Sequence, residues 1–274
     1  MERCELVKVA VIQLNSKQDK QQNLKKIERF IREAATAGAE LVSLPENCNF
    51  LGQDAEKIHP AEEIPTGQTT QLFQQLAKEL NLFVHVGSIT ETYSDTKSYN
   101  TSYVVFPDGE LSSRYRKIHL FDIDIPGVST HKESDFFEAG STLETVELPF
   151  GKAGLSICYD LRFPELYRQY MKQGAKILFV PAAFTRYTGM LHWESLLRAR
   201  AIENQCYVIA AGQHGTYHPG KECFGNSMII DPWGVVVARA SEGEGVTIAD
   251  LKSELVESAR TNIPALTHTR NDVY

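Results

Sequence analysis

Residues 154–166, GLSICYDLRFPEL, lead from an apolar strand through a short charged segment into a helix. The first five residues are apolar enough for a strand buried in a core, and a helix-period segment begins at about Pro164. Two more apolar runs follow, at 176–184 and 205–213, with a helical segment between them. Strands that alternate with helices in this way predict βαβ units and therefore an α/β fold.

The first part of the chain has a similar make-up. Residues 7–14 and 39–44 are predicted to be buried strands on either side of a helix at about 23–36. A second helix, predicted at 69–80, leads into the apolar run LFVHVGSI. Two halves of this kind indicate one α/β domain, residues 1–274, that contains two sheets.

The segment 121–140, FDIDIPGVSTHKESDFFEAG, is too irregular to be assigned to a helix or a strand. We expect a long structured loop there, and loops of this kind often cover active sites. No linker rich in Ser, Gly or Pro marks a domain boundary along the chain.

Charge and composition exclude several classes of protein. A formal net charge of −7 argues against nucleic acid as a partner, because phosphate binding needs clustered Lys and Arg. No apolar run approaches the roughly 18 residues of a membrane span, and the N-terminus does not show the pattern of a signal peptide. The five cysteines include no CxxC pair, which predicts neither a disulfide framework nor a zinc site. We therefore expect a reduced, cytoplasmic protein with no membrane partner.

Several familiar catalytic motifs are absent or incomplete. The sequence has no P-loop and no GxGxxG after a strand, and His192-Trp193-Glu194 lacks the second His of the HExxH zinc motif. GLSIC approaches the GxSxG elbow of serine hydrolases but has Cys158 in the place of the last Gly. A serine hydrolase is therefore not predicted.

Cys158 stands at the end of an apolar strand and just before a helix. In that position, backbone N–H groups and the start of the helix are expected to lower the pKa of the thiol and to activate it as a nucleophile. A packing role is the alternative, because buried free cysteines are common in protein cores. Cys48, in PENCNF, raises the same two possibilities.

Two other predicted strands are followed by residues with charged side chains that can take part in catalysis. Glu46 follows the strand in LVSLPEN, and Lys117 follows the strand in SSRYRKIHLFD. Each residue alone is typical of a solvated loop. Together with Cys158 they supply a base, a cation and a nucleophile, which is the minimum set for acyl transfer from an amide.

These motifs resemble those of the nitrilase superfamily, the carbon–nitrogen hydrolases with a Glu-Lys-Cys triad. LPEN, YRKIHLFD and CYDLRFPEL occur in the family's chain order, and the likeness continues through HWESLLRARAIENQCYV and GNSMIIDPWGVVVA over nearly the whole chain. Within the superfamily, the resemblance is to the branch of ω-amidase and deaminated glutathione amidase. It implies a four-layer α-β-β-α sandwich, in agreement with the two βαβ halves.

The resemblance also implies a mechanism. Glu46 would take the thiol proton of Cys158, and the sulfur would attack the carboxamide carbon while Lys117 and the backbone N–H of Tyr159 stabilise the oxyanion. Ammonia would leave, and water would hydrolyse the remaining thioester to the acid, with no metal and no organic cofactor. Glu133, in HKES, matches a second glutamate near the triad and would orient Lys117 or Glu46, with a loop salt bridge as its alternative.

Four further residues are candidates for substrate binding. Arg162 follows the nucleophile closely and could receive a substrate carboxylate, although a structural ion pair is equally common at such a place. Phe184 and Thr185 end the predicted strand at 176–184, which would bring them to the same sheet edge, and His192 could line the pocket.

Three functions stay open at this point. The first is an amidase that acts on a small ω-amide, such as deaminated glutathione or α-ketoglutaramate, and the second is a nitrile or N-carbamoyl hydrolase of the same superfamily. The third is a catalytically idle scaffold, against which the intact triad counts. We also expect a homodimer or a higher homo-oligomer, formed in part by apolar residues of the helix after the nucleophile: Leu166, Tyr167, Tyr170 and Met171.

Overall fold

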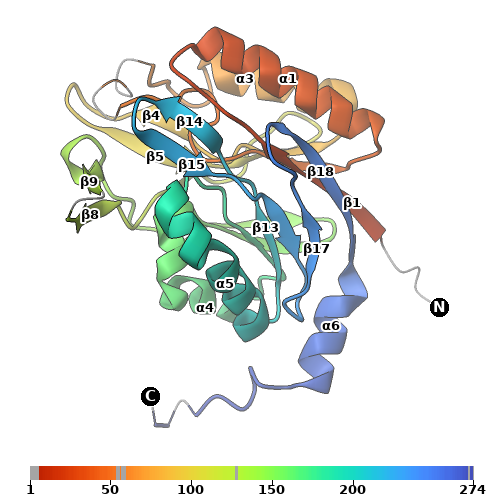
Figure 1. Cartoon of the computed structure of the whole chain (residues 1–274). Coiled ribbons are helices and arrows are strands. Elements are labelled where there is room, and N and C mark those ends of the chain that lie inside the picture. Colours follow the sequence, from red (N-terminus) through yellow and green to blue (C-terminus); the bar gives the residue numbers. More distant parts are fainter. Residues whose placement is uncertain (1–5, 54–55, 57–59, 127–128, 271, 274) are drawn as a thin grey trace.

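Two sheets lie face to face at the centre of the molecule, and helices cover their outer faces (Figure 1). The computed structural model describes residues 6–53, 56, 60–126, 129–270 and 272–273. One sheet has five strands in the order β18-β1-β2-β3-β6, and the other has six in the order β10-β11-β12-β13-β16-β17.

The elements have the following bounds. The strands of the first sheet, in sheet order, are Gly245–Lys252, Leu6–Gln13, Leu41–Ser43, Phe83–His85 and Val104–Val105. Those of the second are Thr145–Leu148, Gly151–Leu155, Ile177–Phe179, Tyr207–Ala210, Met228–Ile230 and Val236–Arg239. The helices α1, α3, α4, α5 and α6 are Lys20–Thr36, Gln68–Leu80, Pro164–Lys172, Arg186–Asn204 and Ser253–Asn262. Smaller sheets join β4 (Ile89–Thr92) to β5 (Ser98–Ser102) and β7 (Tyr115–Arg116), β8 (Asp122–Ile125) to β9 (Ser129–Lys132), and β14 (His214–His218) to β15 (Lys221–Phe224).

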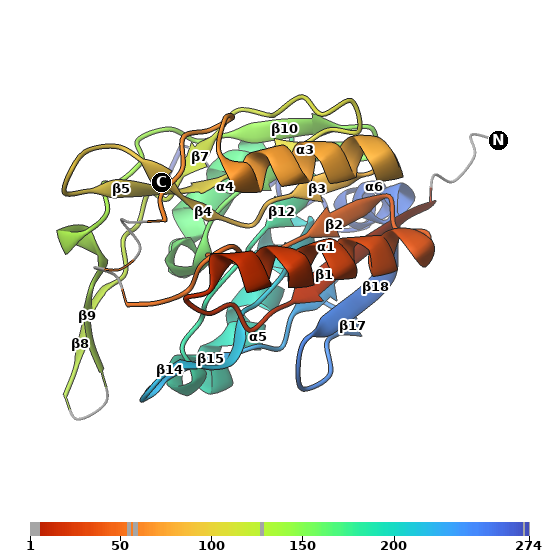
Figure 2. The same cartoon turned by 90° about the horizontal axis from the view of Figure 1, so that it is seen from above.

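Strand β1 shows how the layers arise, because its two faces belong to different hydrophobic cores. Val7, Val9 and Val11 pack in a core that includes the six-stranded sheet. Ala10 and Ile12 point the other way and pack in the core that includes α1 and α3. A strand that is apolar on both faces must be covered on both. Helices α1 and α3, side by side over the first sheet in Figure 2, therefore form one outer layer. Helices α4 and α5 form the other, and the expected four-layer α-β-β-α sandwich is confirmed.

Each sheet has three parallel strands at its centre, β1-β2-β3 in one and β11-β12-β13 in the other. This arrangement confirms the two βαβ halves. Parallel strands end at one edge of their sheet, where α/β proteins commonly place their sites. The residues that follow β2 and β11 therefore lie at the carboxyl edges of the two sheets.

Helices α1 and α5 begin earlier than their apolar periodicity predicts. Helix α1 starts at Lys20 instead of about residue 23, because the side chain of Asp19 accepts a hydrogen bond from the N–H of Gln22 (3.0 Å) and caps the helix. Helix α5 starts at Arg186 instead of about residue 191, with Thr185 as its N-cap residue. The first turn of each helix carries mainly polar residues, so no apolar stripe reveals it in the sequence.

The segment 121–140 was expected to be irregular, and this expectation is wrong for its first half. Strands β8 and β9 form an antiparallel hairpin in which Asp122 pairs with Lys132 and Ile125 with Ser129. The alternation of Asp and Ile in DIDI is that of a strand with one apolar face. In Figure 2 the hairpin projects from the sandwich.

Helix α4 buries in the protein core most of the apolar side chains that were expected to contact a second subunit. Leu166, Tyr167 and Tyr170 are at most 6% exposed and belong to the protein core. Tyr170 lies so close to Gly154 that a Cβ atom there would be 2.6 Å from its ring, which explains the glycine at the start of GLSIC. The expectation that these three residues form an association face is therefore wrong, and only Met171 of the four remains partly exposed.

Four of the five cysteines lie in the described part of the chain and are buried: Cys48, Cys158, Cys206 and Cys223. Of these, Cys48, Cys158 and Cys206 are free thiols. Cys4 lies outside the described residues. No helix among the described residues is long and apolar enough to cross a membrane.

Candidate active site

Three loops that follow strands bring the predicted triad together. Glu46 comes after β2, Lys117 after β7 and Cys158 after β11. The ammonium Nζ of Lys117 lies 3.0 Å from Oε1 of Glu46, and the thiol of Cys158 lies close enough to the same carboxylate for its charge to raise the thiol pKa. All three side chains are more than nine-tenths buried. Glu46 thus contacts both the cation and the nucleophile.

Lys117 is held between two carboxylates. Glu133 places Oε2 at 2.8 Å and Oε1 at 3.1 Å from Nζ, in addition to the contact with Glu46. Burial by itself would lower the pKa of Lys117, but the charges of Glu133 and Glu46 outweigh it and raise the pKa well above the ordinary value. Lys117 is therefore a permanent cation in a site from which solvent is nearly excluded.

Both carboxylates are oriented by further donors. Asn100 Nδ2 donates to Oε1 of Glu46 at 2.9 Å, and the backbone N–H of Ala183 donates to Oε2 at 2.7 Å. The N–H of Phe121 donates to Oε2 of Glu133 at 2.6 Å. With these bonds the two glutamates keep their position relative to Lys117 without help from solvent.

The backbone of Cys158 is unusual for a residue other than glycine. Its φ angle is +50°, and its N–H donates to the carbonyl of Pro181 at 2.9 Å. Left-handed backbone at such a residue costs of order 1–3 kcal/mol and is concentrated at functional sites. The strain turns the side chain at the end of β11 towards Glu46.

The thiol pKa contradicts the sequence-based expectation. Burial, followed by the charge of Glu46, raises the pKa of Cys158 well above its ordinary value, and Lys117 opposes this shift without cancelling it. The sequence shows the nearby helix start but not the buried carboxylate. Cys158 therefore rests as a neutral thiol and needs a base at the moment of attack.

Asp160 joins the loop of the lysine to the loop of the cysteine. Its Oδ2 accepts from the hydroxyl of Tyr115 at 2.7 Å and from the N–H of Ile157 at 2.8 Å. Its Oδ1 accepts from the N–H of His119 at 3.1 Å and lies 2.7 Å from Nδ1 of the same residue. Tyr115 and His119 flank the triad lysine, and Ile157 precedes the nucleophile. The fully buried Asp160 therefore fixes the two loops relative to each other.

A cavity of about 360 Å³ opens above the triad. Glu46, Lys117, Glu133 and Cys158 line its floor. Its mouth is formed by the hairpins β8-β9 and β14-β15 and by the first turn of α5. Among the described residues, no group of three or more His, Cys, Asp or Glu side chains is arranged to hold a metal ion.

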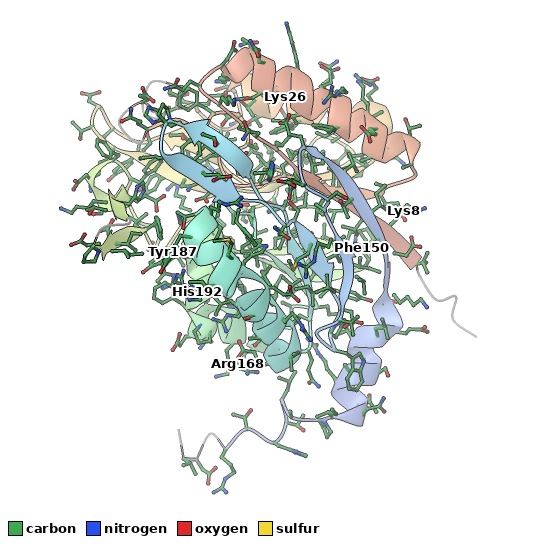
Figure 3. The ribbon with its side chains drawn as sticks, viewed as in Figure 1. Lys8, Lys26, Phe150, Arg168, Tyr187 and His192 are labelled. Atoms are coloured by element: carbon green, nitrogen blue, oxygen red, sulfur yellow. The ribbon has the colours of Figure 1, made fainter. Side chains whose placement is uncertain are left out.

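The structure brings only part of the predicted substrate-binding set to the cavity. Tyr159, Phe184 and Thr185 line it, whereas Arg162 and His192 do not. The guanidinium of Arg162 lies 5.3 Å from the ring centroid of Phe184, and Nη1 is 3.4 Å from Nδ1 of His192. Figure 3 labels Tyr187 and His192 on α5, with Tyr187 nearer the end that borders the cavity. A carboxylate-binding role for Arg162 stays a prediction.

The model of the carbon–nitrogen hydrolase family matches residues 8–261. The chain belongs to the carbon–nitrogen hydrolase family. A deaminated glutathione amidase from Synechocystis sp. (strain PCC 6803 / GT-S) is 44% identical over 263 residues, which cover 94% of this chain and 96% of the relative. The human omega-amidase NIT2 is 41% identical over 269 residues, which cover 97% and 96% of the two chains. The crystal structure of Nit3 from Saccharomyces cerevisiae, a member of branch 10 of the nitrilase superfamily, superposes with a TM-score of 0.87 at 34% identity and covers 98% of this chain and 97% of that one. The chain is therefore a carbon–nitrogen hydrolase that acts on amides.

Several residues of this carbon–nitrogen hydrolase site were not predicted from the sequence. Asp160 stands next to the nucleophile, but nothing in CYDLRF distinguishes a buried carboxylate from one at a solvated helix start. His131, Arg186 and Lys221 line the cavity and come from hairpins and a helix start that the sequence did not reveal. The alternation in DIDI was the one available signal for the first hairpin.

Proposed function

We propose that this carbon–nitrogen hydrolase cleaves the ω-amide of a small keto acid by means of the triad Glu46, Lys117 and Cys158, with deaminated glutathione as its best substrate. One observation carries the proposal: a buried, permanently charged lysine contacts two carboxylates, one of which also lies near the thiol and raises its pKa at the cavity floor. The names of the two relatives support the choice of substrate.

Acylation begins with the transfer of the thiol proton from Cys158 to Glu46 as the sulfur attacks the amide carbon. General base help is required here, because the raised pKa keeps the thiol neutral in the resting enzyme. The oxyanion forms beside the ammonium of Lys117 and the backbone N–H of Tyr159. A preorganised donor of this kind contributes about 3 kcal/mol to the stability of the transition state.

The leaving nitrogen takes the proton from Glu46 as the carbon–nitrogen bond breaks. A primary amide such as α-ketoglutaramate releases ammonia, whereas deaminated glutathione, in which the scissile nitrogen belongs to a peptide, releases the amine of that peptide. The acyl group stays on Cys158 as a thioester. Water then gives a proton to Glu46 and attacks the thioester, and the acid leaves as the thiol is restored.

Glu133 does not reach the reacting atoms in this scheme. Its two oxygens bind Lys117, and its Oε2 also accepts from the N–H of Phe121. We assign it the role of holding Lys117 in place. No step of the reaction needs a metal ion or an organic cofactor.

A product assay with three substrate types tests the proposed function. We expect deaminated glutathione to be hydrolysed best, α-ketoglutaramate less well, and simple aliphatic nitriles poorly or not at all. Hydrolysis of each amide is measured by the amounts of acid and of amine or ammonia that are released. A preference for nitriles would overturn the amidase proposal, and inactivity on every amide would leave the scaffold hypothesis in its place.

We also propose that the enzyme is a homodimer or a multiple of it. With the apolar side chains of α4 largely buried, a group of exposed apolar residues on α5 and the β16-β17 turn provides a contact surface in their place: Ile202, Trp233 and Val235 are 41–54% exposed. Ile202 packs against the turn at Gly234, so these residues share one surface. Light scattering at micromolar concentration should return a dimer mass for the wild type and a monomer mass for Ile202→Glu. The buried free thiols of Cys48, Cys158 and Cys206 lead us to propose the cytoplasm as its compartment.

A further inference from the structure

The basic side chains that line the cavity differ in whether an acidic side chain of the protein already pairs with them. Lys117, on the cavity floor, forms ion pairs with Glu46 and Glu133. Arg186, in the first turn of α5, pairs with Glu222 of β15, and Nη1 and Oε1 are 3.2 Å apart. About half of the Arg186 side chain is exposed, and exposed pairs of this kind are weak. A substrate carboxylate can therefore compete with Glu222 for the guanidinium.

Lys221, the first residue of β15, also lines the cavity and is differently placed. Among the described residues its ammonium forms neither a hydrogen bond nor an ion pair. Its charge contributes only slightly to the lowered pKa of Glu56, behind hydrogen bonds from Gln18 and Gln53. A partly buried ammonium at the mouth of a cavity, without a bound counter-ion, is suited to receive an anion.

The strand that carries Lys221 is tied to the catalytic floor by backbone hydrogen bonds. The N–H of Ala183 donates to Glu46, and the carbonyl of the next residue, Phe184, accepts from the N–H of Phe224 in β15 at 2.9 Å. A bridge between Thr185 and Cys223 continues this contact. The separation between Lys221 and the triad is therefore set by main-chain structure and not by a mobile loop.

The charge of the whole protein makes such a group necessary for an acidic substrate. With a formal net charge of −7, the protein repels anions at long range, and a carboxylate must find positive charge inside the site. Arg162, the candidate predicted from the sequence, does not line the cavity. Lys221 does, and Arg186 is bound to the residue that follows it.

We propose that Lys221 and Arg186 bind the carboxylate that the acyl group carries several bonds away from the scissile amide. Glu222 limits this binding, because it occupies Arg186 and repels the incoming carboxylate. The inference rests on the proposed amidase function and adds the residues that select the substrate: they favour ω-amides of dicarboxylic acids over neutral amides of the same length.

The test compares two five-carbon primary amides that release ammonia, 4-carbamoylbutanoate and pentanamide. We expect the wild type to have a lower KM for the acid. Lys221→Gln should raise the ratio of KM for the acid to KM for the neutral amide about tenfold, as expected for the loss of one ion pair in a partly desolvated site. Glu222→Gln should lower the same ratio about threefold, since it frees Arg186 and removes a negative charge. Lys172→Gln, an exposed lysine of α4, is the control for the change in net charge.

Equal changes of KM for both amides in Lys221→Gln would overturn the proposal, as would a selective loss that occurs in Arg162→Gln but not in Lys221→Gln. A rise of the ratio in Glu222→Gln would also contradict it. The outcome for the proposed function is separate: hydrolysis of both amides without preference refutes only the carboxylate site, whereas inactivity on both amides and on deaminated glutathione and α-ketoglutaramate refutes the amidase.

Discussion

The floor and the mouth of the cavity are built in opposite ways. On the floor, Glu46, Lys117, Glu133 and Cys158 are at most 8% exposed, and each contacts another member of the group. At the mouth, the side chains come from two hairpins and a helix start, and Tyr187 and Met190 are 49% and 57% exposed.

This difference assigns the chemical reaction to the residues of the floor and the selection of the substrate to the residues of the mouth. The buried floor provides the low dielectric that strengthens each charge contact, and loss of one of its charged side chains takes a partner away from another buried charge. Side chains at the mouth can be exchanged at little cost in stability, because they are only partly buried. We therefore expect changes on the floor to act on kcat and changes at the mouth to act on KM.

The largest effect should come from Cys158→Ala. Loss of the nucleophile removes the covalent path, and we expect activity to fall by at least about 10⁴-fold while the far-UV circular dichroism spectrum stays that of the wild type. Cys48→Ala is the matched control: Cys48 is fully buried, but its Sγ contacts the carbonyl of Val86 and not the triad. Loss of activity in the Cys48 variant, with retention in the Cys158 variant, would reverse the assignment.

Lys117→Met should reduce kcat by about 10²- to 10³-fold, because the oxyanion loses a donor. The variant also leaves Glu46 and Glu133 without their cation, so its folded fraction has to be measured by circular dichroism beside the activity. Iodoacetamide labelling of Cys158 gives a second readout. The raised pKa makes labelling slow at pH 7 and faster as the pH rises, and loss of Lys117 should slow it further, since this cation opposes the rise. Ammonia release at the wild-type rate would rule out the oxyanion role.

Asp160→Asn should lower kcat by about 10- to 100-fold with little change in KM, because it loosens the link between the loops of Lys117 and Cys158 without touching the mouth. His119→Gln removes only the ring contact to Asp160 and should have a smaller effect on kcat. Both variants are compared by steady-state kinetics. A rise in KM with kcat unchanged would show that Asp160 acts on the mouth instead.

Ile123→Ser should have the smallest effect. This residue lines the cavity from β8 and is partly exposed, so we expect KM to rise about two- to fivefold from lost apolar contact, with a smaller change in kcat. The free energy of unfolding, measured with urea, should change by less than about 1 kcal/mol. A drop in kcat of tenfold or more would show that the hairpin positions floor residues.

The floor was predictable from the sequence because strand ends carry it. Glu46 and Cys158 follow apolar strands of the two large sheets, and α/β folds commonly place their sites at the carboxyl edges of such strands. Lys117 follows the two-residue strand β7 of a smaller antiparallel sheet, so its place in the site was predicted by the likeness of YRKIHLFD and not by the strand pattern. The direction of the thiol pKa was not predictable, because it depends on burial and on a carboxylate distant in the sequence. The same limit applies to Asp160, whose partners at Tyr115 and His119 are distant in sequence.

The mouth was less predictable for a related reason. Hairpins β8-β9 and β14-β15 are short and carry turns and mixed polarity, so local patterns give little warning of them. Whether Arg162 or Lys221 reaches the cavity depends on how these hairpins fold over the sheet edge. Net charge predicted the need for a cation at the site, but it does not say which one.

The most direct test of the account is to locate the acyl group during turnover. The wild-type enzyme is mixed with α-ketoglutaramate, quenched in acid within milliseconds, digested and analysed by mass spectrometry, and a parallel reaction contains hydroxylamine to trap the thioester as a hydroxamate. The account predicts one acyl group per chain on the peptide that contains Cys158, no acyl group on Cys48, and formation of the hydroxamate. An acyl group on any other residue, or product formation with neither an adduct nor a hydroxamate, would contradict it.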